Sequence, residues 1–285
     1  MDNAETKLIT LIGTPLSQSF SVRMQNRAYK EMNRNMRYFN TEAGIDELKN
    51  VIENVRNDRR FIGAAVTKPD KVEVMKYLDE TDELCSKLGA CNTIVKTPEG
   101  KLRGYNTDGI GFYKALTEEA GINPQGKTFF CYGAGGAGRA ICSILAYHGA
   151  KKIYITSRTQ ESRETMAADI NINFAPVAEA VEPNDCSELG KCDVIINASG
   201  LGMKHRNETP LPREHMNPNA FYFDACYNPE KTKFLLDAES IGAGIMNGLS
   251  MCLYQGAAQI ELWQKKSAPV EAMRDELMQI IKENK

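Results

Sequence analysis

The sequence predicts an α/β fold of two domains, an N-terminal domain with a mostly parallel sheet and a second domain built around a glycine-rich turn. Strand and helix patterns alternate along the first third of the chain, which is typical of parallel strands joined by helices. An apolar strand then runs into a glycine-rich turn and a helix, from Phe129 to Ala140. The length of 285 residues suits two domains, or one large domain with an insertion.

The N-terminal domain is expected to begin with alternating elements. Apolar runs predict strands over residues 8–12, 36–40 and 61–66, with helices over 21–32 and 45–57 between them. A shorter and more antiparallel part follows, with strands over 93–96 and 102–104 around a turn at 98–100.

The later elements predict where the domains divide. A helix over about 109–120 leads into the second domain, which continues with strands over 152–156, 194–197 and 221–225. Two last helices, over about 250–264 and 269–283, have no strand after them and are expected to pack back against the first domain. We predict a first domain of residues 1–106 completed by 246–285, a second domain of residues 107–245, and a ligand cleft between them.

The glycine-rich turn predicts a dinucleotide site. Its Gly133 permits a tight turn, Gly135 lets backbone N–H groups approach a pyrophosphate, and Gly138 allows the helix to pack closely on the strand. A turn that binds nothing is the alternative, but the strand at 152–156 follows at the spacing of a βαβ unit, which favours a Rossmann-like site. The predicted cofactor-binding residues here are Gly133, Ala134, Gly135, Gly136, Ala137 and Gly138.

The residues after the next strand favour NADP over NAD. NAD-binding units usually place Asp or Glu there to hold the ribose 2′-hydroxyl. This chain instead has Ser157, Arg158 and Thr159, with Arg163 shortly after. Arginine can pair with a 2′-phosphate through two hydrogen bonds, and the hydroxyls can add others. A solvated loop arginine is the alternative interpretation of Arg158.

Composition excludes several classes of partner. A net charge of −2 and a pI near 6.0 give no positive electrostatic field that would attract nucleic acid. The sequence has no run of about twenty apolar residues, so a membrane span is not expected. The eight cysteines form no CxxC pair and the N-terminus lacks a signal-peptide pattern, so a cytoplasmic location is expected. The three histidines have no metal-ligand spacing, so no metal is expected. The protein is expected to be a monomer or homodimer that binds a small molecule.

One lysine is a candidate for proton transfer. A buried strand ends at Thr67, and Pro69 is predicted to start a helix, which places Lys71 in its first turn. A positive charge there opposes the helix dipole and favours the neutral amine that a general base needs, whereas a nearby carboxylate would favour the ammonium. A lysine on the protein surface is the other interpretation.

Two polar segments are ambiguous by themselves. The run from Gly104 to Gly109, which includes Asp108, suits either a helix N-cap or a catalytic group. Likewise Ser17, Ser19 and Ser21 follow a strand and can either cap the first helix or bind a carboxylate.

Taken together, these segments resemble the shikimate dehydrogenase family. The resemblance spans nearly the whole chain and adds four segments to those above. It is carried by residues 13–21, 66–71, 89–93, 104–109, 133–140, 157–159, 197–203, 227–229 and 254–258.

The resemblance implies a role for each matched residue. Lys71 is the general acid/base, oriented and stabilised by Asp108, and the first domain binds the substrate. Ser19 and Ser21 hold its carboxylate, while its ring hydroxyls bond to Thr67, Asn92, Asp108 and Gln255. The cofactor residues on this reading are the glycine loop, Ser157, Arg158 and Thr159, with Met203, Tyr227 and Gly248 lining the nicotinamide end.

Three residues depart from the family pattern: Gln18 stands where His is usual, Val22 where Pro is usual, and Ala65 where Asn is usual. The branch that also accepts quinate has a small residue at the last position, and one changed polar group can reassign a substrate. The leading interpretation is an NADP-dependent enzyme that interconverts 3-dehydroshikimate and shikimate in aromatic amino acid biosynthesis. The alternatives are a relative acting on quinate or a similar cyclohexane carboxylate, and a non-catalytic NADP sensor.

Overall fold

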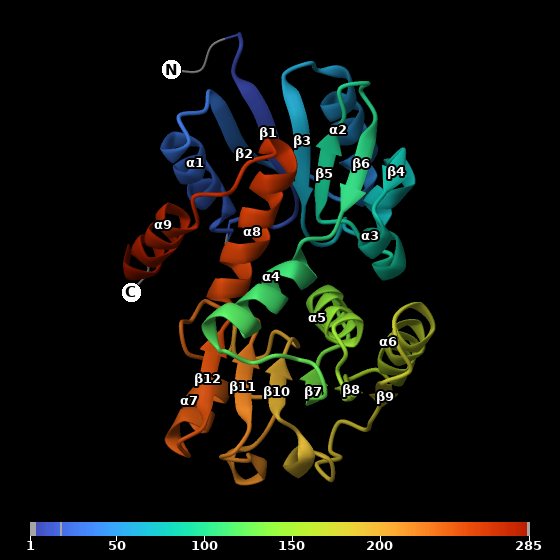
Figure 1. Cartoon of the computed structure of the whole chain (residues 1–285), viewed down its shortest axis with the longest axis vertical. Coiled ribbons are helices and arrows are strands. Elements are labelled where there is room, and N and C mark those ends of the chain that lie inside the picture. The colour runs from blue at the N-terminus through green and yellow to red at the C-terminus, as the bar shows by residue number, and fades with distance from the viewer. Residues whose placement is uncertain (1–3, 18, 284–285) are drawn as a thin grey trace. The chain divides into compact units, whose positions relative to one another are not determined.

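The computed structural model describes residues 4–17 and 19–283. The chain divides into two compact units (Figure 1). Unit 1 comprises Met1–Gly111 and Leu253–Lys285, and unit 2 comprises Phe112–Cys252. The α/β fold class is confirmed, with a mostly parallel sheet in unit 1 and a fully parallel one in unit 2.

Unit 1 is built on a six-stranded sheet in the order β2-β1-β3-β5-β6-β4. Strand β1 pairs in parallel with both β2 and β3, β5 runs antiparallel to β3 and β6, and β4 runs parallel to β6. The predicted change from a parallel to an antiparallel part is confirmed. The strands are β1 (Lys7–Gly13), β2 (Met36–Glu42), β3 (Phe61–Val66), β4 (Glu80–Thr81), β5 (Thr93–Lys96) and β6 (Leu102–Tyr105).

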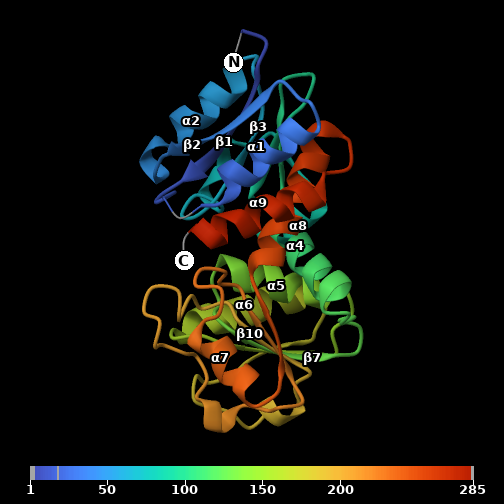
Figure 2. The same ribbon diagram turned by 90° about the vertical axis from the view of Figure 1, so that its left-hand side faces the viewer.

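Helices cover this sheet. Apolar side chains of α2 pack with β3 into one core that includes Leu48, Ile52 and Val66, and α9 lies beside α1 (Figure 2). Helix α4 is followed directly by the π-helix η2 (Ala115–Glu119), and the sequence boundaries between the two units fall within α4 and within α8. The helices are α1 (Ser21–Glu31), α2 (Ile45–Asn57), α3 (Glu83–Leu88), α4 (Asp108–Lys114), α8 (Leu249–Gln264) and α9 (Val270–Glu283).

The helix predicted to start at Pro69 does not form. Residues after β3 make a series of turns, and the next helical segment is the 3₁₀ helix η1 (Glu73–Tyr77). The reason is competition for backbone carbonyls: that of Lys68 accepts from the N–H of Thr14, and that of Lys71 from the N–H of Cys91. These carbonyls therefore accept hydrogen bonds from neighbouring loops and not from a helix. Because Lys71 lies in turns and not in the first turn of a helix, the prediction that a helix dipole favours its neutral amine is wrong.

Unit 2 carries a six-stranded sheet in the order β12-β11-β10-β7-β8-β9, all parallel. Its first strand lies at the centre and the order reverses between β7 and β10, which is the arrangement of doubly wound dinucleotide-binding sheets. The strands are β7 (Thr128–Tyr132), β8 (Lys152–Thr156), β9 (Ala178–Ala180), β10 (Val194–Asn197), β11 (Phe221–Asp224) and β12 (Gly244–Asn247).

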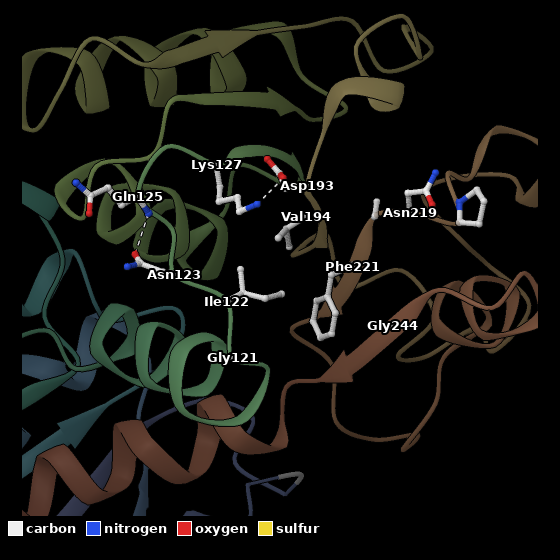
Figure 3. A pocket seen from close by; sticks show the side chains of 12 residues that line it. Gly121, Ile122, Asn123, Gln125, Lys127, Asp193, Val194, Asn219, Phe221 and Gly244 are labelled. Carbon is white, nitrogen blue, oxygen red and sulfur yellow. Dashed lines mark hydrogen bonds and ion pairs between the residues drawn. The ribbon is translucent and has the colours of Figure 1, made fainter.

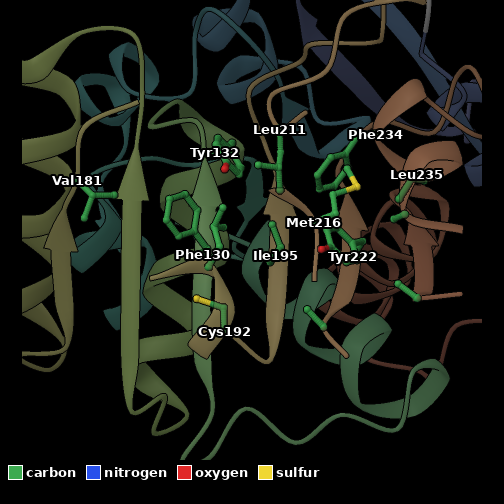
Figure 4. Close-up of a cluster of buried hydrophobic side chains, with 14 residues drawn as sticks. Phe130, Tyr132, Val181, Cys192, Ile195, Leu211, Met216, Tyr222, Phe234 and Leu235 are labelled. Carbon is green, nitrogen blue, oxygen red and sulfur yellow. The ribbon is translucent and has the colours of Figure 1, made fainter. Parts of the chain in front are cut away.

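The helices of unit 2 are α5 (Gly136–Tyr147), α6 (Gln160–Asn173) and α7 (Lys233–Ser240). One face of the sheet is covered by an apolar cluster that includes Phe130, Ile195 and Tyr222 from three adjacent strands and Phe234 of α7 (Figure 4). The ring centroids of Tyr222 and Phe234 lie 5.5 Å apart. Burying each such side chain contributes about 1.5–3 kcal/mol. This core holds the strand ends in fixed register, and the loops that leave them are therefore well placed to form a site.

Candidate functional site

In unit 1 the predicted substrate residues gather at one edge of the sheet. Strands β1 and β3 both end there, β5 begins there, and β6 ends there, because Ala65 pairs with Thr93 and Thr93 pairs with Tyr105. The segments that follow or precede these ends carry Ser19, Ser21, Thr67, Lys71, Asn92 and Asp108. Sheet topology thus brings together residues that are up to 89 positions apart in the sequence.

Lys71 and Asp108 form an ion pair. The Nζ atom of Lys71, from the turns after β3, lies 2.5 Å from Oδ2 of Asp108, the first residue of α4. Their side chains are only 24% and 13% exposed. Partial burial strengthens such a pair relative to one in open solvent, so the geometry holds an ammonium group in a defined place.

Asn92 completes this cluster from the start of β5. Its Nδ2 donates to Oδ1 of Asp108 over 2.8 Å, and its Oδ1 accepts from the backbone N–H of Thr107 over 2.8 Å. Asn92 is almost fully buried. Each oxygen of the Asp108 carboxylate therefore has a separate donor, one charged and one neutral.

The other predicted substrate residues are half-buried around the same edge. Ser19 accepts at Oγ from the backbone N–H of Ser21 over 3.3 Å, but the N-cap residue of α1 is Phe20, which makes no side-chain cap bond. Thr67 donates its N–H to the carbonyl of Ile12, which ties the loops after β1 and β3 together. Gln255 lies on α8, one helical turn before Gln259. Gln18 lies outside the described residues, and Val22 is the second residue of α1.

The glycine loop of unit 2 contains two kinds of glycine. A Cβ on Gly133, whose φ is +114°, would lie 2.6 Å from the backbone of Ala198, and a Cβ on Gly138 would lie 2.0 Å from the carbonyl oxygen of Gly133. Close packing therefore requires these two. Gly135 and Gly136 are exposed and have open space where a side chain would project. The N-cap of α5, Gly135, has no side chain to bond the first N–H groups, so the loop suits a pyrophosphate.

The loop after β8 presents one exposed arginine. Arg158 forms no ion pair or hydrogen bond with any residue that the structure describes, and no acidic residue stands beside it in the sequence. Arg163 differs, because it is buried, donates to the carbonyl of Ser157 and pairs with Glu182. Ser157 donates from Oγ to the carbonyl of Thr159. Of the two arginines, Arg158 is the one that fits a 2′-phosphate.

The remaining predicted cofactor residues lie in loops of the same sheet edge. Met203, after β10, is 39% exposed. Tyr227, after β11, is half-buried, and burial raises the pKa of its hydroxyl well above the usual value. Gly248 precedes α8, and a Cβ there would lie 2.1 Å from the carbonyl oxygen of Ala225, so packing alone requires this glycine.

A buried polar hub that the sequence interpretation missed fixes these loops. Asp224 accepts from Asn197 Nδ2 at 2.9 Å, from Thr232 Oγ1 at 2.6 Å and from the N–H of Cys226 at 2.9 Å. Burial raises the pKa of Asp224, and the three hydrogen bonds oppose that shift. Asn197 also donates to the carbonyl of Leu201. The hub therefore joins the loops that carry Met203 and Tyr227. The sequence did contain a sign of this hub, because Asn197 and Asp224 are polar residues that each end an apolar strand.

A separate cavity of about 590 Å³ lies at the opposite, amino ends of β7, β10, β11 and β12 (Figure 3). Lys127 and Asp193 point toward one another in its wall, with 2.9 Å between their charged atoms. Its lining includes none of the residues predicted for the cofactor. In parallel α/β sheets ligands bind at the carboxyl ends of the strands, so the glycine loop rather than this cavity is the candidate dinucleotide site.

Among residues 4–17 and 19–283, no cluster of three or more His, Cys, Asp or Glu side chains is arranged to hold a metal ion. No helix in that part of the chain combines the length and the apolar character needed to cross a membrane. The eight cysteines are free thiols, and six of them are buried.

Comparison with known proteins agrees with this geometry. The sequence model of the shikimate dehydrogenase substrate binding domain matches residues 11–94, and that of the shikimate 5′-dehydrogenase C-terminal domain matches residues 248–278. The shikimate dehydrogenase (NADP(+)) of Desulforamulus reducens is 41% identical over 281 residues, which cover 96% of each chain.

Solved structures extend the similarity to the fold. A shikimate dehydrogenase in complex with NADP+ superimposes with a TM-score of 0.93 at 36% identity, over 99% of this chain and 98% of its own. A quinate dehydrogenase from Corynebacterium glutamicum in complex with NAD has a TM-score of 0.90 at 25% identity, over 96% and 99% of the two chains. With a curated relative 41% identical along nearly its whole length, this chain belongs to the shikimate dehydrogenase family.

Proposed function

We propose that this chain is an NADP-dependent oxidoreductase that reversibly reduces 3-dehydroshikimate to shikimate, a step of aromatic amino acid biosynthesis. The observation that carries the proposal is the Lys71–Asp108–Asn92 cluster, in which a half-buried ammonium is held at one edge of the sheet with its counter-charge. The relatives at 36–41% identity bear the name of this activity. A protein that only sensed the dinucleotide would have no need of such a cluster.

NADP fits the residues of unit 2. The open space at Gly135 and Gly136 admits a pyrophosphate, with Gly133, Ala134, Ala137 and Gly138 shaping the loop. Arg158, with Ser157 and Thr159, suits the 2′-phosphate, and Met203, Tyr227 and Gly248 belong to loops at the carboxyl edge of the same sheet. When bound, the reduced cofactor supplies the hydride. The absence of an acidic residue beside Arg158 makes NAD the weaker ligand.

Lys71 has the proton-transfer role. In the reductive direction its Nζ gives a proton to the oxygen of the reacting carbonyl, and in the oxidative direction it takes the hydroxyl proton back. Asp108 keeps the ammonium at the reacting oxygen and stabilises its charge. Asn92 holds Asp108 from the other side, so that one carboxylate oxygen stays on Lys71.

The substrate is held by neutral donors and acceptors. We assign the carboxylate of the acid to the hydroxyls of Ser19 and Ser21, which cost little to desolvate. The ring hydroxyls fall to Thr67, Asn92, Asp108 and Gln255. We propose a substrate-binding domain of residues 1–106 and 246–285 and a dinucleotide-binding domain of residues 107–245. Asp108 and Gly248, which lie next to the two boundaries, are the exceptions: Asp108 serves the substrate and Gly248 the dinucleotide.

Quinate is the second candidate substrate, and Ala65 is the observation that favours it. Ala65 is 2% exposed on β3, two residues before Thr67, where the family usually carries an amide. The Corynebacterium glutamicum quinate dehydrogenase shares the fold at 25% identity. An amide at this position would add hydrogen-bonding groups near Thr67, and its loss relaxes the discrimination between related acids.

A steady-state assay with four pairings tests these proposals: shikimate or quinate, each with NADP or NAD. We expect the highest kcat/KM for shikimate with NADP. Higher kcat/KM for quinate would establish the second candidate instead. If the folded protein binds NADP but oxidises neither acid, the enzymatic proposal is refuted in favour of a sensor.

Two further proposals concern the cellular location and the oligomeric state of the enzyme. Eight free thiols suit the reducing cytoplasm, which we propose as its location. We propose a monomer or a homodimer, which size-exclusion chromatography with light scattering distinguishes.

A further inference from the structure

A chain of buried side-chain hydrogen bonds leads from helices α1 and α8 to the Lys71–Asp108 pair. Its members are Gln25, Gln259, Thr93 and Asn92, and each is at most 3% exposed. All of them belong to unit 1. Of these four, only Asn92 belongs to the proposed substrate site, so the structure gives the other three no role yet.

The hydrogen bonds of Gln25 determine which atoms donate and which accept along this series of side chains. Gln25 donates from Nε2 to the backbone carbonyl of Gly256 over 3.1 Å, and a carbonyl can only accept. The same Nε2 donates to Oε1 of Gln259 over 3.2 Å. If the amide of Gln25 were reversed, its Oε1 would face the carbonyl oxygen of Gly256, and neither atom could donate. The Nε2 of Gln25 therefore faces Gln259 as well, and Gln259 must accept through its Oε1.

Gln259 in turn determines that the hydroxyl of Thr93 accepts a hydrogen bond from it. Because Oε1 of Gln259 faces Gln25, its Nε2 faces β5 and donates to Oγ1 of Thr93 over 3.1 Å. The Thr93 hydroxyl has a single proton, and with one lone pair engaged it gives that proton to Oδ1 of Asn92 over 2.7 Å.

The third link reaches the ion pair. Oδ1 of Asn92 accepts from Thr93 on one side and from the N–H of Thr107 on the other. The amide nitrogen of Asn92 is then the group that faces Asp108, at 2.8 Å, and the second carboxylate oxygen is left to Lys71. The opposite orientation would place an amide oxygen against a carboxylate.

We propose that Thr93 and Gln259 are positioning residues that, together with the backbone N–H of Thr107, set the orientation of the Asn92 amide and thereby align Asp108 with Lys71. The proposal rests on the proposed function for its catalytic consequence, but the orientation of Asn92 stands independently of it. Oε1 of Gln25 has no hydrogen-bond partner among the described residues, but from Gln259 to Asn92 every side-chain amide and hydroxyl group of the network is paired. This paired part specifies one arrangement, because leaving any of its groups unpaired is costly. Helix α8 thus contributes Gln259 to the site, in addition to Gln255.

The test uses four variants of the full-length protein. Thr93→Val removes the hydroxyl at nearly constant volume, and Gln259→Met removes the amide. Thr93→Ser restores the hydroxyl. Thr10→Val is the matched control, because Thr10 is a buried strand threonine in the same sheet whose hydroxyl, among residues 4–17 and 19–283, bonds only to Phe39 and Thr41.

We expect Thr93→Val and Gln259→Met to lower kcat about five- to tenfold, the effect of one lost hydrogen bond, while KM for NADPH stays within about twofold. Thr93→Ser and Thr10→Val should retain kcat within about twofold. Unchanged kcat in Thr93→Val, or an equal loss in Thr10→Val, would refute the positioning role. An equal rise in KM for NADPH would show a general structural defect and refute it too.

A second readout needs no turnover. In ¹H–¹⁵N spectra, the side-chain amide of Asn92, assigned by its disappearance in Asn92→Asp, should exchange its protons slowly in the parent protein and in Thr10→Val. It should exchange at least about tenfold faster in Thr93→Val, as expected when a buried bond is lost. Equal exchange in all variants overturns the proposal. If the parent protein oxidises neither acid, the proposed function fails, and this exchange measurement still decides the orientation of Asn92.

Discussion

Lys71 and Asp108 lie 37 positions apart in the sequence, yet their side chains meet at 2.5 Å on one edge of the unit 1 sheet. The backbone fixes both partners: the carbonyl of Lys71 accepts from the N–H of Cys91, and the N–H of Asp108 donates to Oδ1 of Asn106 over 3.1 Å. The ammonium is therefore held in place before any substrate arrives.

Removing the ammonium should abolish most of the turnover. We expect Lys71→Met to lower kcat by about 10²- to 10⁴-fold, because general acid–base catalysis contributes that much. Cofactor affinity, measured by quenching of protein fluorescence, should not change, since Lys71 belongs to unit 1 and the dinucleotide loop to unit 2. The matched control is Lys76→Met, an exposed lysine paired with Glu73, which should keep its kcat within about twofold. A kcat for Lys71→Met equal to that of the parent would remove the lysine from the mechanism.

The two kinds of glycine in the unit 2 loop should respond in opposite ways. Gly138→Ala forces a methyl group to within 2.0 Å of a backbone oxygen. It should lower the free energy of unfolding by at least about 3 kcal/mol, the upper part of the range for overpacking. Gly135→Ala meets open space at φ −82° and should alter stability by less than about 0.5 kcal/mol.

Gly135→Ala should nevertheless weaken NADPH binding about tenfold or more, because the methyl group keeps the pyrophosphate from the backbone N–H groups. Urea unfolding and titration with NADPH measure the two effects separately. Tight NADPH binding by a folded Gly135→Ala protein would place the pyrophosphate elsewhere.

The choice between NADP and NAD should depend on one side chain. Arg158→Gln removes the exposed guanidinium, and we expect KM for NADP to rise about 10- to 100-fold, the value of a charge-assisted hydrogen bond. KM for NAD, which has no 2′-phosphate, should change less than about threefold. Arg213→Gln, at another exposed arginine of unit 2, is the control. Equal effects of Arg158→Gln on the two cofactors would contradict the assignment.

The sequence was sufficient where local rules decide the structure. The elements over 45–57, 61–66, 93–96 and 194–197 match their predicted bounds, because apolar periodicity and turn residues define them locally. The glycine loop was predictable for the same reason. Elements with weak apolar patterns were missed, among them β9, β12 and α6.

The other failures of prediction involve contacts between distant segments. Pro69 favours a helix start locally, but Thr14 and Cys91 take the carbonyls that this helix would need. Nothing in the spacing of residues shows that Arg163 is engaged by Glu182 while Arg158 remains exposed. The pairing of Lys71 with Asp108 was available only through family resemblance. The hydrogen bond from Gln259 to Thr93 could not be predicted from the sequence at all.

Asp70 directly precedes Lys71, the proposed proton-transfer residue, in the sequence. Asp70 is fully buried, and neither of its carboxylate oxygens has a hydrogen-bond partner among the described residues. Burial raises the pKa of Asp70 above its usual value. Asp224 is also buried with a raised pKa, but three donors hold its oxygens.

A raised pKa means that the folded protein binds this proton more tightly than the unfolded chain does. The penalty for ionising Asp70 is therefore absent below about pH 4, the ordinary value for aspartate, and grows as the pH rises toward the raised folded value. Asp70→Asn removes the charge and keeps the shape, so its thermal midpoint should exceed that of the parent at pH 7, with a gain that shrinks as the pH falls toward 4. Asp224→Asn, which replaces an acceptor with a donor facing donors, should unfold at a lower temperature at every pH in that range. Scanning calorimetry of both variants between pH 4 and pH 8 checks this. A gain for Asp70→Asn that does not depend on pH would mean that the buried carboxyl group is not the cause of the change in stability.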